Sequence, residues 1–442
     1  ARDNSIISDT NIYNSRGNGM EFYGTEDLTI QNCHIDNCGF SGTLLYAIAG
    51  NLNIIDNTIS NNYYHGLYFR YETSNLNIIN NSIINNRQDG IRFNGTRYNY
   101  SIINIEGNDF GMQYNSWKAG IRAEYVDGNV LISITNNRFF STTLLHYGIE
   151  VWASELDEVS NNIFQRLGHA MLVSNNCVVH NFTNNTLFES GGIDINDNMS
   201  IINSISSNTF SHQDDIIESD GTINNIKFNS FIVGSNHFSG SGNYPNLLGE
   251  INQSNINGHP SDTWYNIFMD DAMFADIGDV YYDFVDFTLL PESPLIDAGD
   301  IEQIDPDGTI RDMGALYYDQ GNVAPAIESI NSTQVYGVSP LYVQLTAEID
   351  GPVSSWNWDA GNGQSSTNYS PIFTYNEPGI YSISLNVEGP GGSDTFQYID
   401  FITVVEPTLP PNANFTSNVT TGLAPLEVEF TNLTLNQTDS YI

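Results

Sequence analysis

A short phrase built around asparagine recurs through the first half of the chain. In each copy the asparagine is followed two positions later by an apolar residue, as in Asn57-Thr58-Ile59 and Asn81-Ser82-Ile83. A fixed period of this size, without helical periodicity between the copies, predicts a solenoid in which each repeat forms one coil of β-structure. The asparagines stand 23 to 29 residues apart, at Asn57, Asn81, Asn108, Asn137, Asn162, Asn185, Asn208 and Asn236.

A second phrase lies between these copies and begins with glycine, as in Gly66-Leu67-Tyr68-Phe69 and Gly90-Ile91-Arg92-Phe93. Its apolar/polar alternation is the pattern of a half-buried strand that follows a turn. Together the phrases predict an all-β parallel β-helix over residues 1–250, with coils about 4.8 Å apart. Asparagine suits its corners because it tolerates a left-handed backbone and can hydrogen-bond to the same amide in the next coil. A leucine-rich repeat is excluded because its leucine frame is absent.

The charge of the chain excludes some partners. It has 52 acidic and 12 basic residues and a formal net charge of -40. Nucleic acids and anionic membrane surfaces require a basic patch, so neither is an expected partner. No run of eighteen apolar residues is present, and we expect no membrane insertion. Three cysteines form no metal-type spacing, and no nucleophile, zinc or phosphate-loop motif occurs.

The segment after the repeats carries a specific resemblance. It reads Ser293-Pro294-Leu295-Ile296-Asp297-Ala298-Gly299, followed by Asp305-Pro306-Asp307-Gly308 and Asp312-Met313-Gly314-Ala315. With the asparagine repeats, this ending resembles secreted bacterial right-handed parallel β-helix proteins of the pectate-lyase-like superfamily. The resemblance implies a right-handed helix, a C-terminal cap over residues 251–322 and an extracellular location.

Residues 323–406 resemble a PKD-type module, an immunoglobulin-like β-sandwich of extracellular proteins. The resemblance lies in Trp356-Asn357-Trp358-Asp359, Gly361-Asn362-Gly363 and Pro378-Gly379-Ile380-Tyr381. Alternation in Tyr381-Ser382-Ile383-Ser384-Leu385 agrees with strands. Residues 407–442 begin with a proline-rich linker and then repeat the start of the module at Ala413-Asn414-Phe415, so we expect a second, truncated PKD-type module there.

Outward positions on one strand of each coil should stack into a stripe of side chains along the solenoid. Arg92 and Arg122 should be about 5 Å apart on adjacent coils, where like charges repel unless Glu124, Glu150 or an anionic ligand pairs with them. Aromatic neighbours would suit sugar rings. The alternative is a surface salt-bridge ladder without function. The candidate glycan-binding stripe comprises Tyr68, Arg70, Arg92, Arg122, Glu124, Glu150 and Trp152.

Two further sets of residues are candidates for chemistry. A lyase acting on uronic polysaccharides needs a base and a cation, which Lys118, Arg122, His146 and Glu150 could supply. Carboxylates at alternate positions before a glycine can bind calcium, which makes Asp305, Asp307 and Asp312 a candidate metal site. The alternative is an aspartate-rich turn whose side chains cap backbone amides.

These patterns lead to two hypotheses. The first is an extracellular cell-surface structural or adhesion protein, such as a filament or sheath subunit, because no catalytic motif is visible. Its partners would be a polysaccharide, another cell-surface protein or further copies of itself. The alternative is a polysaccharide-active enzyme, a lyase on an anionic glycan. Calcium is the one cofactor that the sequence indicates.

Overall fold

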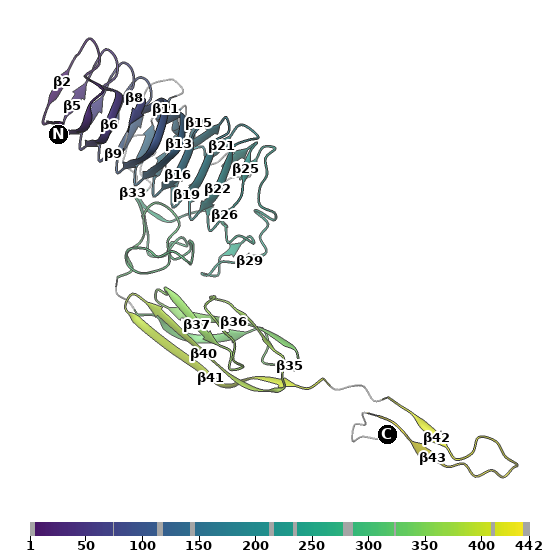
Figure 1. Ribbon diagram of the computed structural model, residues 1–442. Coiled ribbons are helices and arrows are strands. Elements are labelled where there is room, and N and C mark those ends of the chain that lie inside the picture. Colours follow the sequence, from purple (N-terminus) through teal and green to yellow (C-terminus); the bar gives the residue numbers. More distant parts are fainter. Residues whose placement is uncertain are drawn as a thin grey trace. The chain divides into compact units, whose positions relative to one another are not determined.

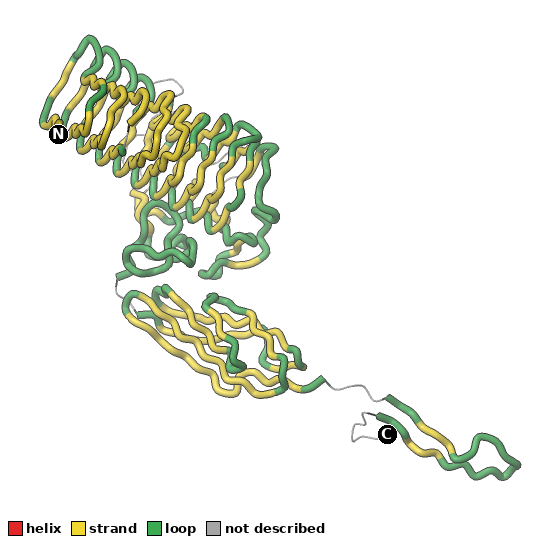
Figure 2. The backbone as a smooth tube through the Cα atoms, in the orientation of Figure 1, coloured by secondary structure: helices red, strands yellow, loops and turns green. Residues whose placement is uncertain are grey.

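The computed structural model describes residues 5–73, 75–112, 118–141, 146–211, 216–232, 237–276, 286–321, 324–407 and 412–435. The chain forms two compact units, Ala1–Asn322 and Val323–Ile442. Within the described residues both consist of strands and loops, with no helix (Figure 2). The predicted all-β class, a right-handed parallel β-helix followed by a PKD-type β-sandwich, is confirmed.

The first unit is a solenoid whose successive coils pair in parallel to form two long sheets (Figure 1). The larger sheet contains two strands of most coils: β1 (Ser5–Ser8), β3 (Met20–Tyr23), β4 (Glu26–Gln31), β6 (Thr43–Ile55), β8 (Leu67–Thr73), β9 (Leu76–Ile79), β11 (Ile91–Glu106), β13 (Ala119–Thr135), β15 (Tyr147–Trp152), β16 (Glu155–Ser160), β18 (His169–Ser174), β19 (Val178–Thr183), β21 (Ile193–Ile195), β22 (Ile201–Ser206), β24 (Ile217–Ser219), β25 (Thr222–Ile223), β26 (Ile226–Lys227) and β28 (Phe238–Ser239).

The second sheet takes one short strand from each coil. Its members are β2 (Asn11–Tyr13), β5 (His34–Asp36), β7 (Thr58–Ser60), β10 (Ser82–Ile84), β12 (Asp109–Met112), β14 (Arg138–Ser141), β17 (Ile163–Gln165), β20 (Thr186–Phe188), β23 (Thr209–Ser211), β27 (Ser230–Ile232), β31 (Ile267–Met269), β30 (Pro260–Ser261) and β29 (Gln253–Ser254). Strands β29 and β30 join antiparallel at the last coil, so the parallel repeat ends there.

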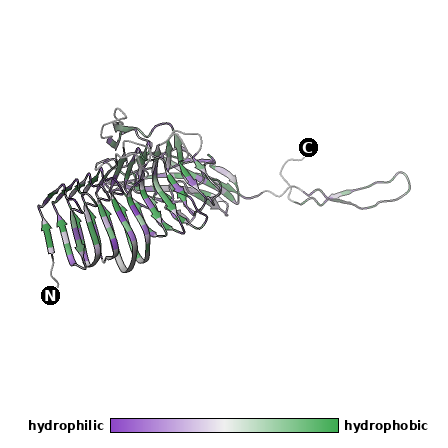
Figure 3. Cartoon of the chain, turned by 90° about the horizontal axis from the view of Figure 1, so that it is seen from above, coloured by the Kyte–Doolittle hydropathy of each residue, from purple (hydrophilic) through white to green (hydrophobic). Residues whose placement is uncertain are grey.

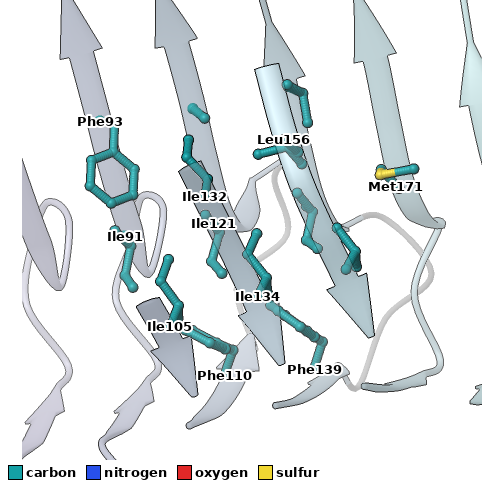
Figure 4. Close-up of a cluster of buried hydrophobic side chains, with 14 of the residues drawn as sticks. Ile91, Phe93, Ile105, Phe110, Ile121, Ile132, Ile134, Phe139, Leu156 and Met171 are labelled. Carbon is teal, nitrogen blue, oxygen red and sulfur yellow. The ribbon is translucent and has the colours of Figure 1, made fainter. Parts of the chain in front are cut away.

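The apolar residues of both phrases form the core between the sheets. In strands such as β9 and β14 buried apolar residues alternate with less buried ones, and bands of similar hydropathy cross neighbouring coils (Figure 3). Figure 4 shows Phe110 and Phe139 pointing into this core beside Ile105 and Ile134. The ring centroids of Phe110 and Phe139 are 4.8 Å apart, and those of Phe139 and Phe164 are 4.9 Å apart. Equivalent side chains therefore stack at the spacing of the coils.

Two adjacent residues form the corner: one makes the hydrogen-bond ladder and the other has the left-handed backbone, although the sequence predicted both roles for one asparagine. The ladder asparagine is buried, and its Oδ1 accepts the backbone N–H and the side-chain amide of its counterpart in the preceding coil, as Asn108 does for Asn81. The left-handed backbone belongs to the residue before it: Asn80 has φ 55°. The expectation that one residue does both is therefore wrong.

The ladder also continues differently from the sequence prediction. After Asn208 the next amide is Asn229, and Asn229 N–H donates to Asn266 Oδ1 at 3.0 Å. Asn236, which the spacing placed next, lies outside the described residues. The interval from Asn208 to Asn229 is shorter and the interval from Asn229 to Asn266 is longer, because the loops between β23, β27 and β31 change length while the corner stays in register.

The glycine that opens the second phrase is required by close packing. A Cβ on Gly120 would lie 2.6 Å from Phe139 Cδ1 and 2.9 Å from Gly148 O. A Cβ on Gly90 would similarly lie 2.6 Å from Gly120 O. The backbone therefore passes so close to the next coil that no side chain fits.

The segment after the last coil folds back along the side of the solenoid. Its strands β32 (Phe274–Asp276) and β33 (Asp286–Leu289) pair antiparallel, and Phe274 and Phe287 pack around Phe188. Further along, Gly314 N–H donates to Ser207 O at 2.8 Å, and Ala315 N–H donates to Thr186 Oγ1 at 2.9 Å. The segment is thus attached to β20 and to the corner before β23.

The second unit is a β-sandwich around Trp358 and Tyr375, both fully buried. Tyr375 Oη donates to Ala360 O at 3.0 Å. One sheet contains β34 (Ala326–Ser332), β36 (Leu341–Asp350) and β39 (Ile372–Tyr375). The other contains β35 (Tyr336–Val338), β41 (Gly392–Val405), β40 (Gly379–Gly389), β37 (Ser355–Asp359) and β38 (Ser365–Ser366). Beyond residue 411, β42 (Phe415–Ser417) and β43 (Phe430–Asn432) form an antiparallel pair.

Candidate functional site

The predicted stripe lies on the outer face of strands β8, β11, β13 and β15. Parallel register places Tyr68, Arg92, Arg122 and Glu150 in one column across these strands. A second column, two residues further along each strand, contains Arg70, Asn94, Glu124 and Trp152. All members of the two columns therefore face outward from neighbouring coils.

A buried carboxylate that the sequence analysis missed lies at the centre of this face. Asp89 immediately precedes Gly90 at the start of β11, and only 1% of its surface is exposed. Its Oδ2 lies 3.1 Å from Arg92 Nη1, and its Oδ1 lies 3.3 Å from Arg122 Nε. Its Oδ1 also accepts the backbone N–H of Ala119 at 3.1 Å. Asp89 thus joins both guanidinium groups to the backbone of the next coil.

Two glutamates complete the ion-pair network. Glu124 Oε2 lies 2.5 Å from Arg92 Nη2, and Glu124 Oε1 lies 3.8 Å from Arg122 Nη1. Glu150 Oε2 lies 2.5 Å from Arg122 Nη2. Three carboxyl groups therefore surround two guanidinium groups whose side chains are each 17% exposed. We refer to Asp89, Arg92, Arg122, Glu124 and Glu150 as the charged network.

Burial changes the proton affinity of two side chains at this face. Burial raises the pKa of Glu150 to about 7; Arg122 opposes the shift, and Asp89 and Glu124 add to it. Burial also lowers the pKa of His65 to about 4, so its ring is neutral at pH 7. His65 Nδ1 therefore accepts the N–H of Asp89 at 3.2 Å, and the 3.4 Å approach to Asp89 Oδ2 is not an ion pair.

Lys118 and His146, the remaining candidates of the lyase hypothesis, lie directly before the first residues of β13 and β15. Lys118 O accepts the N–H of Tyr147, and His146 O accepts the N–H of Gly168, so Lys118 and His146 are at equivalent positions of successive coils. Lys118 is partly exposed, whereas His146 is 1% exposed. The structure therefore joins Arg122 and Glu150 directly and places Lys118 and His146 one position before the strand-opening residues Ala119 and Tyr147.

The aromatic members of the stripe are more accessible than the charged network. Trp152 is 39% exposed, and Tyr68 is partly exposed. The guanidinium of Arg70 lies over the ring of Tyr68, 5.7 Å from its centroid. Asp89 was missed because it occupies the turn before the strand and does not belong to the alternating outward positions. Its one sequence signal was an acidic residue directly before a phrase-opening glycine.

The three aspartates of the candidate metal site act as hydrogen-bond acceptors. Asp305 Oδ2 accepts the N–H of Asp312 at 2.7 Å, and Asp312 Oδ2 accepts the N–H of Tyr318 at 2.7 Å. Asp307 accepts the N–H groups of Thr309 and Gln320. Among the described residues, no group of three or more histidine, cysteine, aspartate or glutamate side chains is arranged to hold a metal ion. These contacts match the capped aspartate-rich turn.

The part of the chain that the structure describes contains no helix with the length and apolar character of a membrane crossing.

Two family models match the chain. The model described as "Right handed beta helix region" matches residues 1–139, and the model described as "PKD domain" matches residues 329–398.

Similar proteins cover parts of the chain. A pre-pro-metalloprotease of Vibrio cholerae, present in two strains, is 38% identical over 77 residues, which is 17% of this chain and 8% of the relative. The chain therefore spans less than a tenth of that relative. The crystal structure of the PKD1 domain of Vibrio anguillarum Epp is 28% identical over 19% of this chain and 99% of that domain, with a TM-score of 0.17.

A second solved structure covers a larger share of the chain. The crystal structure of pectate lyase Pel9A is 14% identical, covers 66% of this chain and 73% of its own, and has a TM-score of 0.37. A likeness at this level says nothing about activity. The coil register and the match over residues 1–139 identify the first unit, and the match over residues 329–398 identifies the sandwich. The chain is therefore a right-handed β-helix protein that carries a PKD domain, a combination typical of extracellular proteins.

Proposed function

We propose that this protein is a cell-surface structural and adhesion protein, in which the solenoid presents a binding surface outside the cell. The observation that carries the proposal is that the arginines of the charged network already have carboxyl partners within the chain. Both Arg92 and Arg122 are already paired with carboxyl groups of the chain. A side chain engaged in this way supports the face of the sheet, and it offers no unpaired cation for a reacting substrate.

The two kinds of fold support the same proposal. Parallel coils form a long, regular surface that suits the binding of extended ligands. A PKD domain is typical of proteins that work outside the cell. The strong excess of acidic residues keeps such a surface soluble and disfavours anionic partners. Its partners would be a polysaccharide or another cell-surface protein, and further copies of the chain would be the partner if it forms a filament or sheath.

Labelling of intact cells tests the location and role together. Antibody against the purified chain should bind unpermeabilised cells, and mild protease treatment of those cells should remove the signal. Deletion of the gene should reduce attachment to the natural surface, and re-expression should restore it. Signal seen only after permeabilisation, or unchanged attachment of the deletion strain, would contradict the proposal.

A second candidate, a lyase on an anionic glycan, is favoured by one observation. The pKa of Glu150 is raised to about 7, which suits a group that exchanges protons near neutral pH. In that reaction Glu150 would take the C5 proton of a uronate, the C4=C5 double bond would form as the C4–O bond breaks, and the departing sugar oxygen would take a proton from water. Lys118, Arg122 and His146 would then have to neutralise the substrate carboxylate.

A substrate panel separates the two candidates. The full chain is incubated with alginate, polygalacturonate, glycosaminoglycans and sulfated galactans, with and without calcium, while the absorbance of the unsaturated product is followed. The structural proposal expects no product on any substrate. Product formation that is lost in Glu150→Gln and retained in Glu155→Gln, an exposed glutamate outside the network, would establish the lyase instead.

A further inference from the structure

Exposed tyrosine rings gather on the outer face of the first coils, beside the charged network. Tyr23 and Tyr46 occupy one column on β3 and β6, and their ring centroids are 5.4 Å apart. The next residue in that column is Arg70, whose guanidinium lies over Tyr68. We call Tyr23, Tyr46, Tyr64, Tyr68 and Arg70 the tyrosine face.

The tyrosine face continues across the turn before β8. His65 lies between two rings, with its centroid 4.5 Å from that of Tyr64 and 4.9 Å from that of Tyr68. Because His65 is 5% exposed and neutral at pH 7, it fills the space behind the rings without adding charge. Tyr64 is 42% exposed and Tyr23 is 60% exposed. The rings therefore form a supported surface that is open to solvent.

Exposed rings of this kind favour a particular ligand chemistry. An aromatic face carries negative charge density, which attracts the weakly positive C–H groups on the flat side of a pyranose ring. Tyrosine adds a hydroxyl that can exchange hydrogen bonds with sugar hydroxyls. Coils about 4.8 Å apart repeat the rings at a spacing close to the length of one sugar unit. A chain of pyranose units can therefore contact several rings at once.

The charges around the tyrosine face decide between neutral and anionic sugars. The neighbouring guanidinium groups of Arg92 and Arg122 are bound by Asp89, Glu124 and Glu150. Glu21 lies at the other end, where its Oε2 accepts the Tyr23 hydroxyl at 3.4 Å and its Oε1 accepts an amide N–H of Asn18. An anionic glycan would meet carboxyl groups at both ends of the face and the guanidinium of Arg70 between them, whereas a neutral glycan would find hydrogen-bond partners at both ends.

We propose that the tyrosine face binds a neutral polysaccharide of pyranose units, which stack on Tyr23, Tyr46, Tyr64 and Tyr68. This inference rests on the proposed surface function and names the chemical class of its partner. Trp152 continues the second column on β15, and beyond it the columns carry Leu172 and Asp194 in one and Ser174 in the other, so the group of neighbouring tyrosines is found in the first coils.

Binding of the full chain to defined glycans tests the proposal. Soluble β-glucan, xylan and mannan are the neutral probes, and alginate and polygalacturonate are the anionic ones, in affinity electrophoresis and titration calorimetry. The double variant Tyr23→Ala/Tyr64→Ala should weaken binding of the preferred neutral glycan at least about tenfold, or about 1.4 kcal/mol. The matched control Tyr336→Ala/Tyr342→Ala removes two rings of the sandwich that are at least as exposed and should bind normally.

The outcomes are separable from those of the surface proposal. Circular dichroism must show that both double variants keep the β-structure of the parent. Preference for the anionic probes, equal weakening by both double variants, or no binding to any neutral probe would overturn the inference. A protein that labels on intact cells and binds none of these glycans would leave the surface function standing without the tyrosine face.

Discussion

Arg92 and Arg122 are direct neighbours in register on β11 and β13, and the carboxylate of Asp89 contacts both guanidinium groups. Like charges in opposed positions destabilise a sheet unless counter-charges hold them. Here the counter-charge comes from a residue that is almost fully buried. We therefore expect the stability of this face to depend on Asp89 more than on Glu124 and Glu150, which are less deeply buried.

Replacement of Asp89 tests that dependence. Asp89→Ala leaves two arginines short of a partner and removes the acceptor for the N–H of Ala119. We expect the free energy of unfolding of the solenoid to fall by about 3–5 kcal/mol in urea titration. The control is Glu155→Ala, whose exposed pair with His180 should contribute about 0–1 kcal/mol. Equal effects of the two variants would contradict a central role for Asp89.

The asparagine ladder gives a second prediction. Asn162 donates to Ile134 O at 2.8 Å, and its Oδ1 accepts the N–H of Asn137. Asn162→Ala leaves those buried groups without partners, so we expect a loss of about 2–4 kcal/mol in the same titration. Asn181→Ala, an exposed asparagine of β19, should change stability by less than about 0.5 kcal/mol. A loss below about 1 kcal/mol for Asn162→Ala would show that the ladder contributes little.

Stability should fall as the pH rises through the neutral range. Burial raises the pKa of Asp312 to about 8 and the pKa values of Asp297 and Asp305 to about 6. Because these folded-state values lie above the unfolded ones, the stabilisation is complete below about pH 4 and is lost as the pH rises through about 6 to 8. Glu150 acts in the same direction around pH 7.

Melting temperatures between pH 5 and pH 9 measure this effect. The melting temperature of the solenoid should decrease from about pH 6 to pH 9, and Asp312→Asn should flatten the decrease above about pH 7. Asp220→Asn serves as the control, because hydrogen bonds from Ser241 lower the pKa of this exposed side chain. A melting temperature that rises over this interval would contradict the assignment.

The aspartate-rich turn can be separated from a calcium site by one variant. Asp307 accepts N–H groups from Thr309 and Gln320, so Asp307→Ala should lower the melting temperature equally with calcium and with EDTA. Calcium at Asp305, Asp307 and Asp312 stays a proposal from the sequence. It would be supported if calcium raised the melting temperature of the parent, sodium chloride of matched ionic strength did not, and Asp307→Ala abolished the response.

Much of the solenoid could be predicted because each repeat is marked by two short sequence motifs, the asparagine phrase and the glycine phrase. The alternation in the glycine phrase correctly placed Arg92 and Arg122 on adjacent coils. The left-handed residue escaped prediction because Asn80 and Asn81 are both asparagine, and only their contacts reveal which one forms the ladder. The intervals to Asn229 and Asn266 escaped prediction because loop insertions change the spacing without changing the register.

The candidate site was predicted only in part for a related reason. Outward residues follow from alternation, so Glu124 and Glu150 could be placed beside the arginines. Asp89 lies in a turn, where no periodic rule applies, and its partners come from two different coils. Tyr46 was missed because its ring contact with Tyr23 joins two coils, and Tyr64 was missed because it lies in a turn outside the alternating positions.

The returning segment also determines where a pulling force would enter the solenoid. The first unit ends at Asn322, and shortly before that point Gly314 and Ala315 are bonded to Ser207 and Thr186 of earlier coils. Tension arriving from the C-terminal part would load the hydrogen bonds of Gln320 and Tyr318 first and then β20 and the corner before β23, ahead of the last strand, β31. The coils from β23 to β31 would then carry little of this force. The solenoid should therefore resist extension as one unit and should not unfold coil by coil from its C-terminal end.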